Sequence, residues 1–476
     1  MTCARFQLRS IVALIALLTA CGGEDGAAPV TGPAEIRGTI AYVENECREQ
    51  GGVLTLQQSL RVRPSNGSIA TALSLTTLGP ADVTDICGLF APGRLGLLFT
   101  IIGAFQRLAV SPDASSVVFE ITPDFSIVQL NPIAPEQQGI FLIRADGSGL
   151  RRLGDASREP PFLIGEMEDQ LAAVQIPGFA FSPNSRLLAL VDRVAEPDGQ
   201  ESTQVFTLDV RTGERRQITQ LPPVPVADTG GLSTCCPNFL DDQTLAFSSL
   251  ANPDGMNPEG NLTVFIVNTD GTGLHIVPLP IAEPGARFVP TFSITGERPA
   301  AGVFYSPEDA VNGGLVQEIF LVDGRNTLQL TRFQRSDTGT PIFSRNDARA
   351  YFVASANPLG GNPYENCQIF SIERNAADLR QITDFDEGMP SANGCLFGPP
   401  PGCAIELVGQ DPATHNFVLY SSCNPVGTNP NGGQLFAIRP DGSGLTQITS
   451  SRGLLQEPNG DTLVELPGPY AFSVLP

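Results

Sequence analysis

One short phrase recurs along the chain and is most complete at Gln434–Thr449 (QLFAIRPDGSGLTQIT). It reads as a strand with alternating side chains, an Asp441-Gly442 turn and a second strand. Asp-Gly between two such runs predicts a β-hairpin with a two-residue turn, because that turn needs positive φ. The same phrase stands at 140–153 and 263–277, with weaker copies at 204–218, 318–330 and 368–382. A hairpin repeated about every 50 to 70 residues predicts a repeat architecture.

Two further strands precede each hairpin. The first ends in a turn of the Phe-Ser-Pro-Asp kind, as at 109–113 and 180–184, and the second is strongly apolar, as at 117–121 and 187–191. This four-strand unit resembles the blade of TolB-type, WD40-like (PD40) β-propellers, and the resemblance covers nearly all of 104–450. It implies four-stranded sheets that pack face to face around a ring. TolB itself carries an α/β domain before its propeller and is not lipidated, so its own partners are not carried over.

We therefore expect an all-β chain that forms a single β-propeller of seven four-stranded blades. Strands near 39–43, 60–64 and 69–73 supply three strands of an N-terminal blade, and 469–474 supplies its missing first strand. The C-terminal strand would then close the ring and leave no open edge. Six blades with an irregular N-terminal cap, or eight blades, are the alternatives. The apolar run 95–102 is too short to span a membrane.

The N-terminus has the features of an export signal. Arg5 and Arg9 precede a short apolar run at 11–18, and Leu18-Thr-Ala-Cys21 follows. The last four residues resemble the lipobox of bacterial lipoproteins, which implies that Cys21 becomes lipidated. We expect a signal peptide at 1–20, a flexible tether at 21–35 and the propeller at 36–476, with the protein exported and anchored in the cell envelope. A plain secretory signal is the alternative.

Composition narrows the choice of partner. The chain has 28 basic residues against 50 acidic ones, and its formal net charge is -22. Nucleic acids and anionic membrane surfaces attract basic patches, so neither is expected as a partner. Contact with a membrane is expected only through the lipid anchor. The 41% hydrophobic fraction is sufficient for a folded core.

The connections between strands differ on the two faces of the predicted propeller. Those joining the first to the second strand and the third to the fourth are short and uniform, and we call their side the smooth face. The remaining connections are long and irregular, and we call their side the decorated face; they are 44–59, 76–103, 122–138, 154–177, 249–261 and 384–403. Function concentrates on loops that a rigid scaffold holds. A site is therefore expected on the decorated face or in the adjoining central channel.

Eight cysteines fall in or beside connections of the decorated face: Cys47, Cys87, Cys235, Cys236, Cys367, Cys395, Cys403 and Cys423. An even number in an exported chain predicts disulfides. Proximity along the chain and around the ring favours Cys47–Cys87 and Cys395–Cys403, followed by Cys367–Cys423 and Cys235–Cys236. A zinc site is the alternative, but the spacing lacks paired C-x-x-C ligands. No metal and no cofactor are expected.

The motif N-P-x-G-x-N-P occurs at 252–258, 357–363 and 424–430, in blades four, six and seven. Asn, Pro and Gly are turn-forming residues, so a rigid loop without further function is one interpretation. The other is a repeated binding platform. Its candidate residues are Asn252, Asp254, Asn257, Asn357, Asn362, Tyr364, Asn424 and Asn429.

No catalytic residue can be named. The chain lacks a G-x-S-x-G elbow, an H-E-x-x-H helix and a P-loop. Its two histidines, His275 and His415, are expected on a solvent-facing strand position and in a turn. Carboxylates are plentiful, with 384–387 and 241–242 as examples, so an Asp/Glu glycosidase stays open.

The function we expect is a non-enzymatic, envelope-anchored interaction platform whose partner is another envelope protein. A module that binds a glycan or small ligand at the decorated face is the first alternative. An enzyme that acts on polysaccharide with two carboxylates is the second. The chain has six Tyr and no Trp, which weakens the glycan hypothesis because sugars stack on aromatic rings.

Overall fold

The computed structural model describes residues 32–50, 53–65, 67–80, 87, 103–123, 133–159, 162–167, 170–175, 178–197, 199–224, 233–260, 263–277, 287–289, 300–305, 316–323, 326–333, 341–344, 348–385, 405–429, 432–456 and 462–473. The chain divides into two compact units, Met1–Pro33 and Ala34–Pro476, and all of its strands belong to the second. Within the described residues no helix is both long and apolar enough to cross a membrane. The export signal and Cys21 lie outside the described residues, as does the apolar run 95–102.

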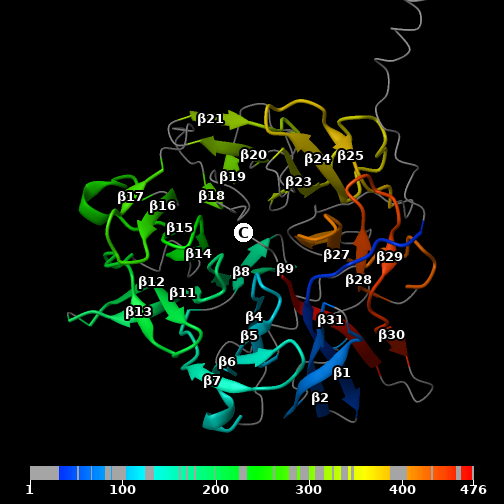
Figure 1. The fold of residues 1–476 in the computed structure, drawn as a ribbon, viewed down its shortest axis with the longest axis horizontal. Helices are drawn as coiled ribbons and strands as arrows, with labels where there is room; N and C mark the ends of the chain where they lie inside the picture. Colours follow the sequence, from blue (N-terminus) through cyan, green and yellow to red (C-terminus); the bar gives the residue numbers. More distant parts are fainter. Residues whose placement is uncertain are drawn as a thin grey trace, which may run out of the picture. The chain divides into compact units, whose positions relative to one another are not determined.

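The second unit is an all-β propeller with six four-stranded blades (Figure 1). In each blade the strands lie in sequence order and pair antiparallel. We keep the numbers two to seven for these blades. Blade two comprises β4 (Phe105–Val110), β5 (Ser116–Ile121), β6 (Gly139–Arg144) and β7 (Arg151–Gly154); blade three comprises β10 (Phe179–Phe181), β11 (Leu187–Ala195), β12 (Glu201–Asp209) and β13 (Arg215–Gln217); blade four comprises β14 (Thr234–Phe239), β15 (Thr244–Ser249), β16 (Thr263–Asn268) and β17 (His275–Ile276). Blade five comprises β18 (Arg287–Val289), β19 (Ala300–Tyr305), β20 (Val316–Asp323) and β21 (Asn326–Gln329); blade six comprises β22 (Ile342–Phe343), β23 (Arg349–Ala354), β24 (Gln368–Glu373) and β25 (Arg380–Gln381); blade seven comprises β26 (Ile405–Gln410), β27 (Phe417–Ser421), β28 (Gln434–Ile438) and β29 (Thr446–Gln447).

A five-stranded sheet, which we call the terminal sheet, contains both ends of the propeller. Its strand order is β3-β2-β1-β31-β30, from β1 (Ile40–Gln50), β2 (Val53–Arg63), β3 (Ala70–Pro80), β30 (Gly453–Gln456) and β31 (Thr462–Phe472). The expected pairing of a C-terminal strand with the N-terminal sheet is present, with Tyr42 opposite Tyr470. The prediction of seven four-stranded blades is wrong, because this sheet gains β30 as a fifth strand and the other blades number six.

The terminal sheet also corrects one predicted loop. Residues 44–59 were assigned to an irregular connection, but β1 and β2 continue pairing from Ile40 opposite Arg63 to Gln50 opposite Val53. The alternation of polar and apolar residues in 53–63 is what a long strand requires, and it continues past the expected boundary. A second hairpin, of β8 (Phe162–Met167) and β9 (Gln170–Gln175), lies in the predicted loop 154–177. Two short 3-10 helices, η3 (Pro135–Gln137) and η5 (Pro253–Gly255), complete the described elements.

The core consists of apolar clusters shared by successive sheets. One cluster joins the terminal sheet to blade two, and others join blades two and three, three and four, five and six, and six and seven. Another joins blade seven back to the terminal sheet through Tyr420, Tyr42 and Phe472. Because each blade packs on both of its faces, central strands such as β27 and β28 are buried along their whole length.

The repeated Asp-Gly turns also differ from the prediction. Arg144 accepts a hydrogen bond from Gly147 N–H at 2.8 Å and donates one to the Ser148 carbonyl at 2.9 Å. This pattern is a three-residue loop with only the glycine at positive φ (80°), not a two-residue turn. The equivalent Gly442, at φ 85°, faces blade six so closely that an added Cβ would lie 2.2 Å from the Ile382 carbonyl oxygen. Glycine is therefore required at Gly442 both for the turn and for blade packing.

Candidate functional site

The three N-P-x-G-x-N-P loops share one hydrogen-bond pattern on the decorated face. The backbone N–H of the second Asn donates to the side-chain oxygen of the first, at 2.7 Å for Asn257 to Asn252. The same bond is 2.8 Å from Asn362 to Asn357 and 2.7 Å in the third copy, from Asn429 to Asn424. Each loop is thus closed by its own first asparagine, which takes the place of a backbone turn.

The second asparagine of each motif then fastens its loop to the end of the preceding strand. Its side-chain amide donates to the carbonyl six residues earlier: Ala251 for Asn257 at 3.2 Å, Ala356 for Asn362 at 2.9 Å and Cys423 for Asn429 at 3.0 Å. All three second asparagines are buried. These amides hold the loop together and are not presented to solvent, so the structural interpretation accounts for them.

The loops present other side chains instead. The variable residue of the motif is exposed in every copy, as Asp254, Leu359 or Val426, and Tyr364 follows the second copy. Leu359 is 52% exposed, Tyr364 43% and Val426 40%. The other large apolar side chains that stand exposed in the described part of the chain are Val53, Leu150 and Leu328. Blades six and seven therefore display three apolar side chains on two locked loops, which we call the loop triad.

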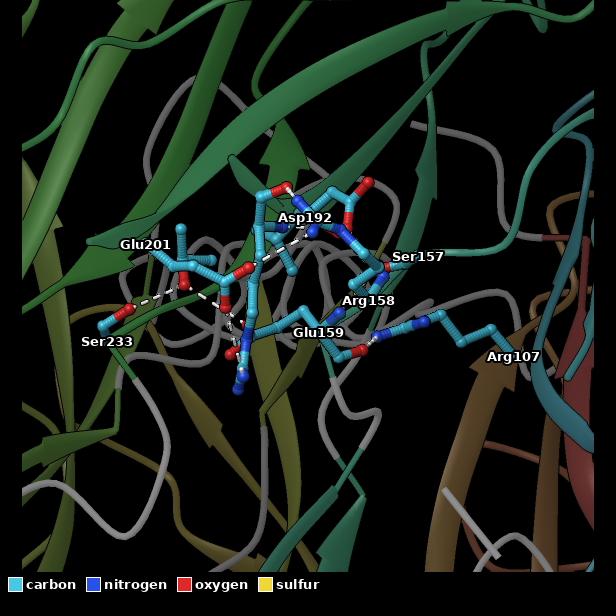
Figure 2. Close-up of polar contacts among 10 residues, drawn as sticks. Arg107, Ser157, Arg158, Glu159, Asp192, Glu201 and Ser233 are labelled. Atoms are coloured by element: carbon cyan, nitrogen blue, oxygen red, sulfur yellow. Dashed lines mark hydrogen bonds and ion pairs between the residues drawn. The ribbon is translucent and has the colours of Figure 1, made fainter. Parts of the chain in front are cut away.

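A charged cluster, which we call the clamp, lies at the decorated-face ends of blades two and three (Figure 2). Arg158 and Glu201 are exposed, and its other side chains are buried or half-buried. Its members are Arg107 on β4, Glu120 on β5, Ser157, Arg158 and Glu159 after β7, Asp192 and Arg193 on β11, Glu201 and Thr203 on β12, and Arg215 on β13. The positions come from strand ends: a charged residue follows an apolar run at 117–119 and again at 187–191. That is the one sequence signal that could have indicated the clamp.

Arg107 and Glu120 form the deepest ion pair of the clamp. Their side chains are 3% and 0% exposed, and Arg107 Nη1 donates to Glu120 Oε2. Glu120 Oε1 accepts the backbone N–H of Ser157 at 2.5 Å. Arg107 Nη2 donates to the carbonyl of Glu159. Blade two thereby holds the segment that leads to blade three.

Blade three holds the same segment from the other side. Asp192 Oδ1 accepts the backbone N–H of Arg158 at 2.6 Å, and its Oδ2 accepts Arg215 Nη2 at 2.5 Å. Arg193 Nε donates to Glu159 Oε2 at 2.7 Å. Burial raises the pKa of the Glu159 carboxyl, and the bonds from Arg193 and Thr203 oppose that rise.

The polar atoms of the clamp are largely paired. Among its buried side-chain atoms, Arg107 Nε, Arg215 Nε and Glu159 Oε1 have no hydrogen-bond partner in the described residues. Four arginines face four carboxylates, so the clamp has no excess charge to attract an ion. Its ion pairs fasten the segment 157–159 to blades two and three.

A third polar group was missed by the sequence analysis. Tyr470 on β31 donates its hydroxyl hydrogen to Glu406 Oε2 on β26, and the Tyr470 ring stacks on Tyr420 at 5.5 Å. β26 is the first strand of blade seven, and β31 lies between β1 and β30 in the terminal sheet. Burial raises the pKa of Glu406 to about 7, against the bond from Tyr470, which lowers it. Glu406 is therefore a carboxyl that changes charge near neutral pH.

The cysteines largely occupy disulfides. Cys47 is bonded to Cys87 and Cys235 to Cys236, which are two of the four predicted pairs. Cys367 and Cys423 are buried and disulfide-bonded. Cys395 and Cys403 lie outside the described residues, so the pairing among these last four stays a prediction. Among the described residues no group of His, Cys, Asp and Glu could hold a metal ion.

The remaining candidate acids and histidines do not converge. Asp241 and Asp242 are exposed in the β14–β15 turn on the smooth face, where Asp242 accepts Asn184 N–H at 2.9 Å. Asp384 is exposed on the decorated side of blade six, and 386–387 lie outside the described residues. His275 is exposed on β17, and His415 is exposed at positive φ in the β26–β27 turn, as expected.

A cavity of about 600 Å³ lies where the sequence analysis did not expect one. Its lining comes from the smooth-face ends of blades six and seven: Ser344, Ala348, Arg349, Tyr351, Gln410, His415 and Pro440. Arg349 is already engaged by Asp378 at 2.8 Å. A site was expected among the loops of the opposite face because their length varies, whereas this cavity is formed by short, uniform turns.

Comparison with known proteins adds no function. No protein-family model matches the chain, and no curated protein sequence is significantly similar to it. Among solved structures, TolB from Acinetobacter baumannii is 13% identical, with a TM-score of 0.38 over 91% of this chain and 83% of that one. The β-propeller domain of the Trilobed protease from Pyrococcus furiosus is 12% identical, with a TM-score of 0.40 over 86% and 98%. An oligogalacturonate lyase from Vibrio parahaemolyticus is 10% identical, with a TM-score of 0.37 over 84% and 98%. These similarities concern the β-propeller alone.

Proposed function

We propose that this chain is a non-enzymatic, lipid-anchored β-propeller of the cell envelope that binds another envelope protein through the loop triad. The observation that supports this most directly is the combination of Leu359, Tyr364 and Val426 in the open with asparagines that lock the loops beneath them. A contiguous patch of exposed apolar side chains marks an interaction site, and we propose that these three form one such patch. A loop that is already rigid loses little entropy on binding, so more of the contact energy becomes affinity.

The polar groups support a binding role over a catalytic one. The charges of the clamp neutralise one another in salt bridges, and its deepest pair is enclosed between two blades. Burial raises the pKa of Glu406 to about 7, and the side chain that hydrogen-bonds to it is a tyrosine rather than a second acid. A glycosidase of the usual kind needs two carboxyl groups flanking the scissile bond.

The test is a cross-linking pull-down from intact envelopes with the full chain as bait. The variant is Leu359→Ser, Tyr364→Ser and Val426→Ser together. The matched control is Leu150→Ser with Leu328→Ser, which removes exposed apolar side chains away from the loop triad. We expect one partner to be captured by the parent and the control and to be reduced by about tenfold or more in the triad variant, since three contacts are lost.

Two results would contradict the proposal. Equal capture by all three proteins would place the binding surface elsewhere. Absence of any captured protein, together with glycan-array binding that the triad variant loses, would favour the glycan-binding alternative.

A further inference from the structure

The outer edge strand of each blade is short, whereas the outer edge strand β3 of the terminal sheet is long. The fourth strands of the six blades, β7, β13, β17, β21, β25 and β29, are two to four residues long. Three of them carry arginine: Arg151 and Arg152 on β7, Arg215 and Arg216 on β13, and Arg380 on β25. Short length and charge are the ordinary means by which proteins prevent an edge strand from pairing with another chain.

Strand β3 has neither protection. It runs for 11 residues, Ala70–Pro80, with the sequence ATALSLTTLGP, which contains no charged residue and no proline before its last position. It pairs with β2 on its inner side from Val62 opposite Ala70 to Val53 opposite Pro80, with a register shift between Leu60 and Arg61. Beyond that shift, 73–80 pair with β2 without interruption, and this is the stretch of edge that a second strand would use. Among the described strands none pairs with its outer side. A long edge without charge is a template for strand addition.

The side chains of β3 also fit an added strand. Leu73 and Leu75 are partly buried and pack against the cluster shared with blade two. Ser74 and Thr76 point to the other side and are exposed. A partner strand with the same alternation would extend both rows, apolar against apolar and hydroxyl against hydroxyl.

We propose that β3 pairs antiparallel with β3 of a second copy of this chain, which joins two terminal sheets into one. An antiparallel edge presents alternating donors and acceptors, so two copies related by a two-fold axis satisfy each other's backbone groups. The two-fold also keeps the Leu73 side of both strands on one face. Because β3 is uncharged, the pairing places no like charges opposite each other, which a pair of the arginine-bearing edges would do.

Charge elsewhere in the chain makes the association depend on salt. Each copy has a formal net charge of -22. The two copies therefore repel one another at low ionic strength, and salt screens that repulsion. Dimerisation through β3 is expected to strengthen as salt is raised, the opposite of an interface held by ion pairs.

The experiment is sedimentation velocity on the full chain carrying Cys21→Ser, so that no lipid can drive association, over a wide concentration range at low and high salt. We expect a dimer that forms with concentration and is favoured by salt. Hydrogen exchange measured on the same samples should show that amides in 70–80 become protected as the dimer forms, since strand pairing buries them.

Variants test the edge itself. Ser74→Lys with Thr76→Lys should weaken the dimer by about tenfold or more, because like charges then face one another across the pair. Ser74→Glu with Thr76→Glu should do the same, and a mixture of the lysine and glutamate variants should restore association. Gln217→Lys on β13 is the matched control for added charge on another outer strand and should leave the dimer unchanged.

Three results would overturn the proposal: a chain that stays monomeric at every concentration and salt, a dimer that the lysine variant retains, or a dimer without protection in 70–80. If β3 instead pairs with a strand of a different protein, the purified chain stays monomeric, which is the first of these results. None of these results bears on the loop triad, so this proposal and the proposed function fail independently.

Discussion

At the scale of single residues, the second asparagine of each N-P-x-G-x-N-P motif has a structural role that the motif does not reveal. Asn257, Asn362 and Asn429 were candidates for a binding platform, yet each is buried and bonded to the end of the preceding strand. An amide has both a donor and an acceptor, so the same residue suits a ligand or a loop. The sequence pattern is identical in the two cases, and only the direction of the side chain separates them.

Replacing Asn362 should therefore affect stability. Asn362→Ala removes amide bonds to the carbonyls of Ala356 at 2.9 Å and Asn366 at 2.7 Å and leaves buried groups unpaired. We expect a loss of about 1–3 kcal/mol in the free energy of unfolding, measured by denaturant titration. Leu359→Ser in the same loop is the control and should change it by less than about 0.5 kcal/mol. Equal losses for both variants would refute the structural role of Asn362.

Glu406 gives a prediction for pH. Its pKa is about 7 in the folded chain against an ordinary 4.5, so between these values the folded state holds a proton that the unfolded state lacks. Stability from this group therefore falls as pH rises from 4.5 to 7. Glu406→Gln cannot ionise, so relative to the parent it should be more stable above pH 7 than below 4.5, by about 1–3 kcal/mol. Thermal unfolding across that pH range measures the difference, and a constant difference would refute it.

At the scale of elements, the sheets differ in the contacts that hold their connecting segments in place. Blades two and three are fastened by the clamp, where Glu120 pairs with Arg107 and also accepts the backbone N–H of Ser157. The terminal sheet is fastened in another way, by the Cys47–Cys87 disulfide near the end of β1. These fastenings lie on the decorated face, where the connections between strands are longest. They restrain the segments that packing between the sheets does not reach.

Breaking the clamp should cost more than removing it. Glu120→Gln leaves Arg107 buried without its counter-ion, and we expect a loss of about 3–5 kcal/mol in unfolding free energy. Glu120→Leu with Arg107→Leu removes both charges and should lose less than Glu120→Gln alone. Denaturant titration of the single and double variants gives the coupling between them. A double variant less stable than Glu120→Gln would contradict this prediction, because the unpaired Arg107 charge would then not be the main cause of the lost unfolding free energy.

At the scale of the whole molecule, the propeller separates its core from its surfaces. Apolar clusters lie between successive sheets, and a few loop residues, such as Ile133, Ala251 and Phe385, belong to them. The loop triad and the outer edge of β3 are both outside these clusters. Binding of a partner protein and pairing of two copies would therefore use different surfaces. The pull-down and the sedimentation experiment address them separately.

The sequence by itself determined the repeat, because periodic hairpins with apolar second strands leave few ways to bury both faces of each sheet. It also indicated the return of a C-terminal strand to β1 and the Cys47–Cys87 pair. Local patterns were sufficient in each case, since alternation, turn residues and proximity along the chain carry the information.

Only the tertiary structure decided the fifth strand of the terminal sheet, the burial of Asn362 and the pairing of Arg107 with Glu120. The same holds for Glu406 and Tyr470, which are 64 residues apart. These features depend on which residues of different sheets come into contact. Such contacts are set by how the sheets pack, and neither periodicity nor residue type within one strand specifies them.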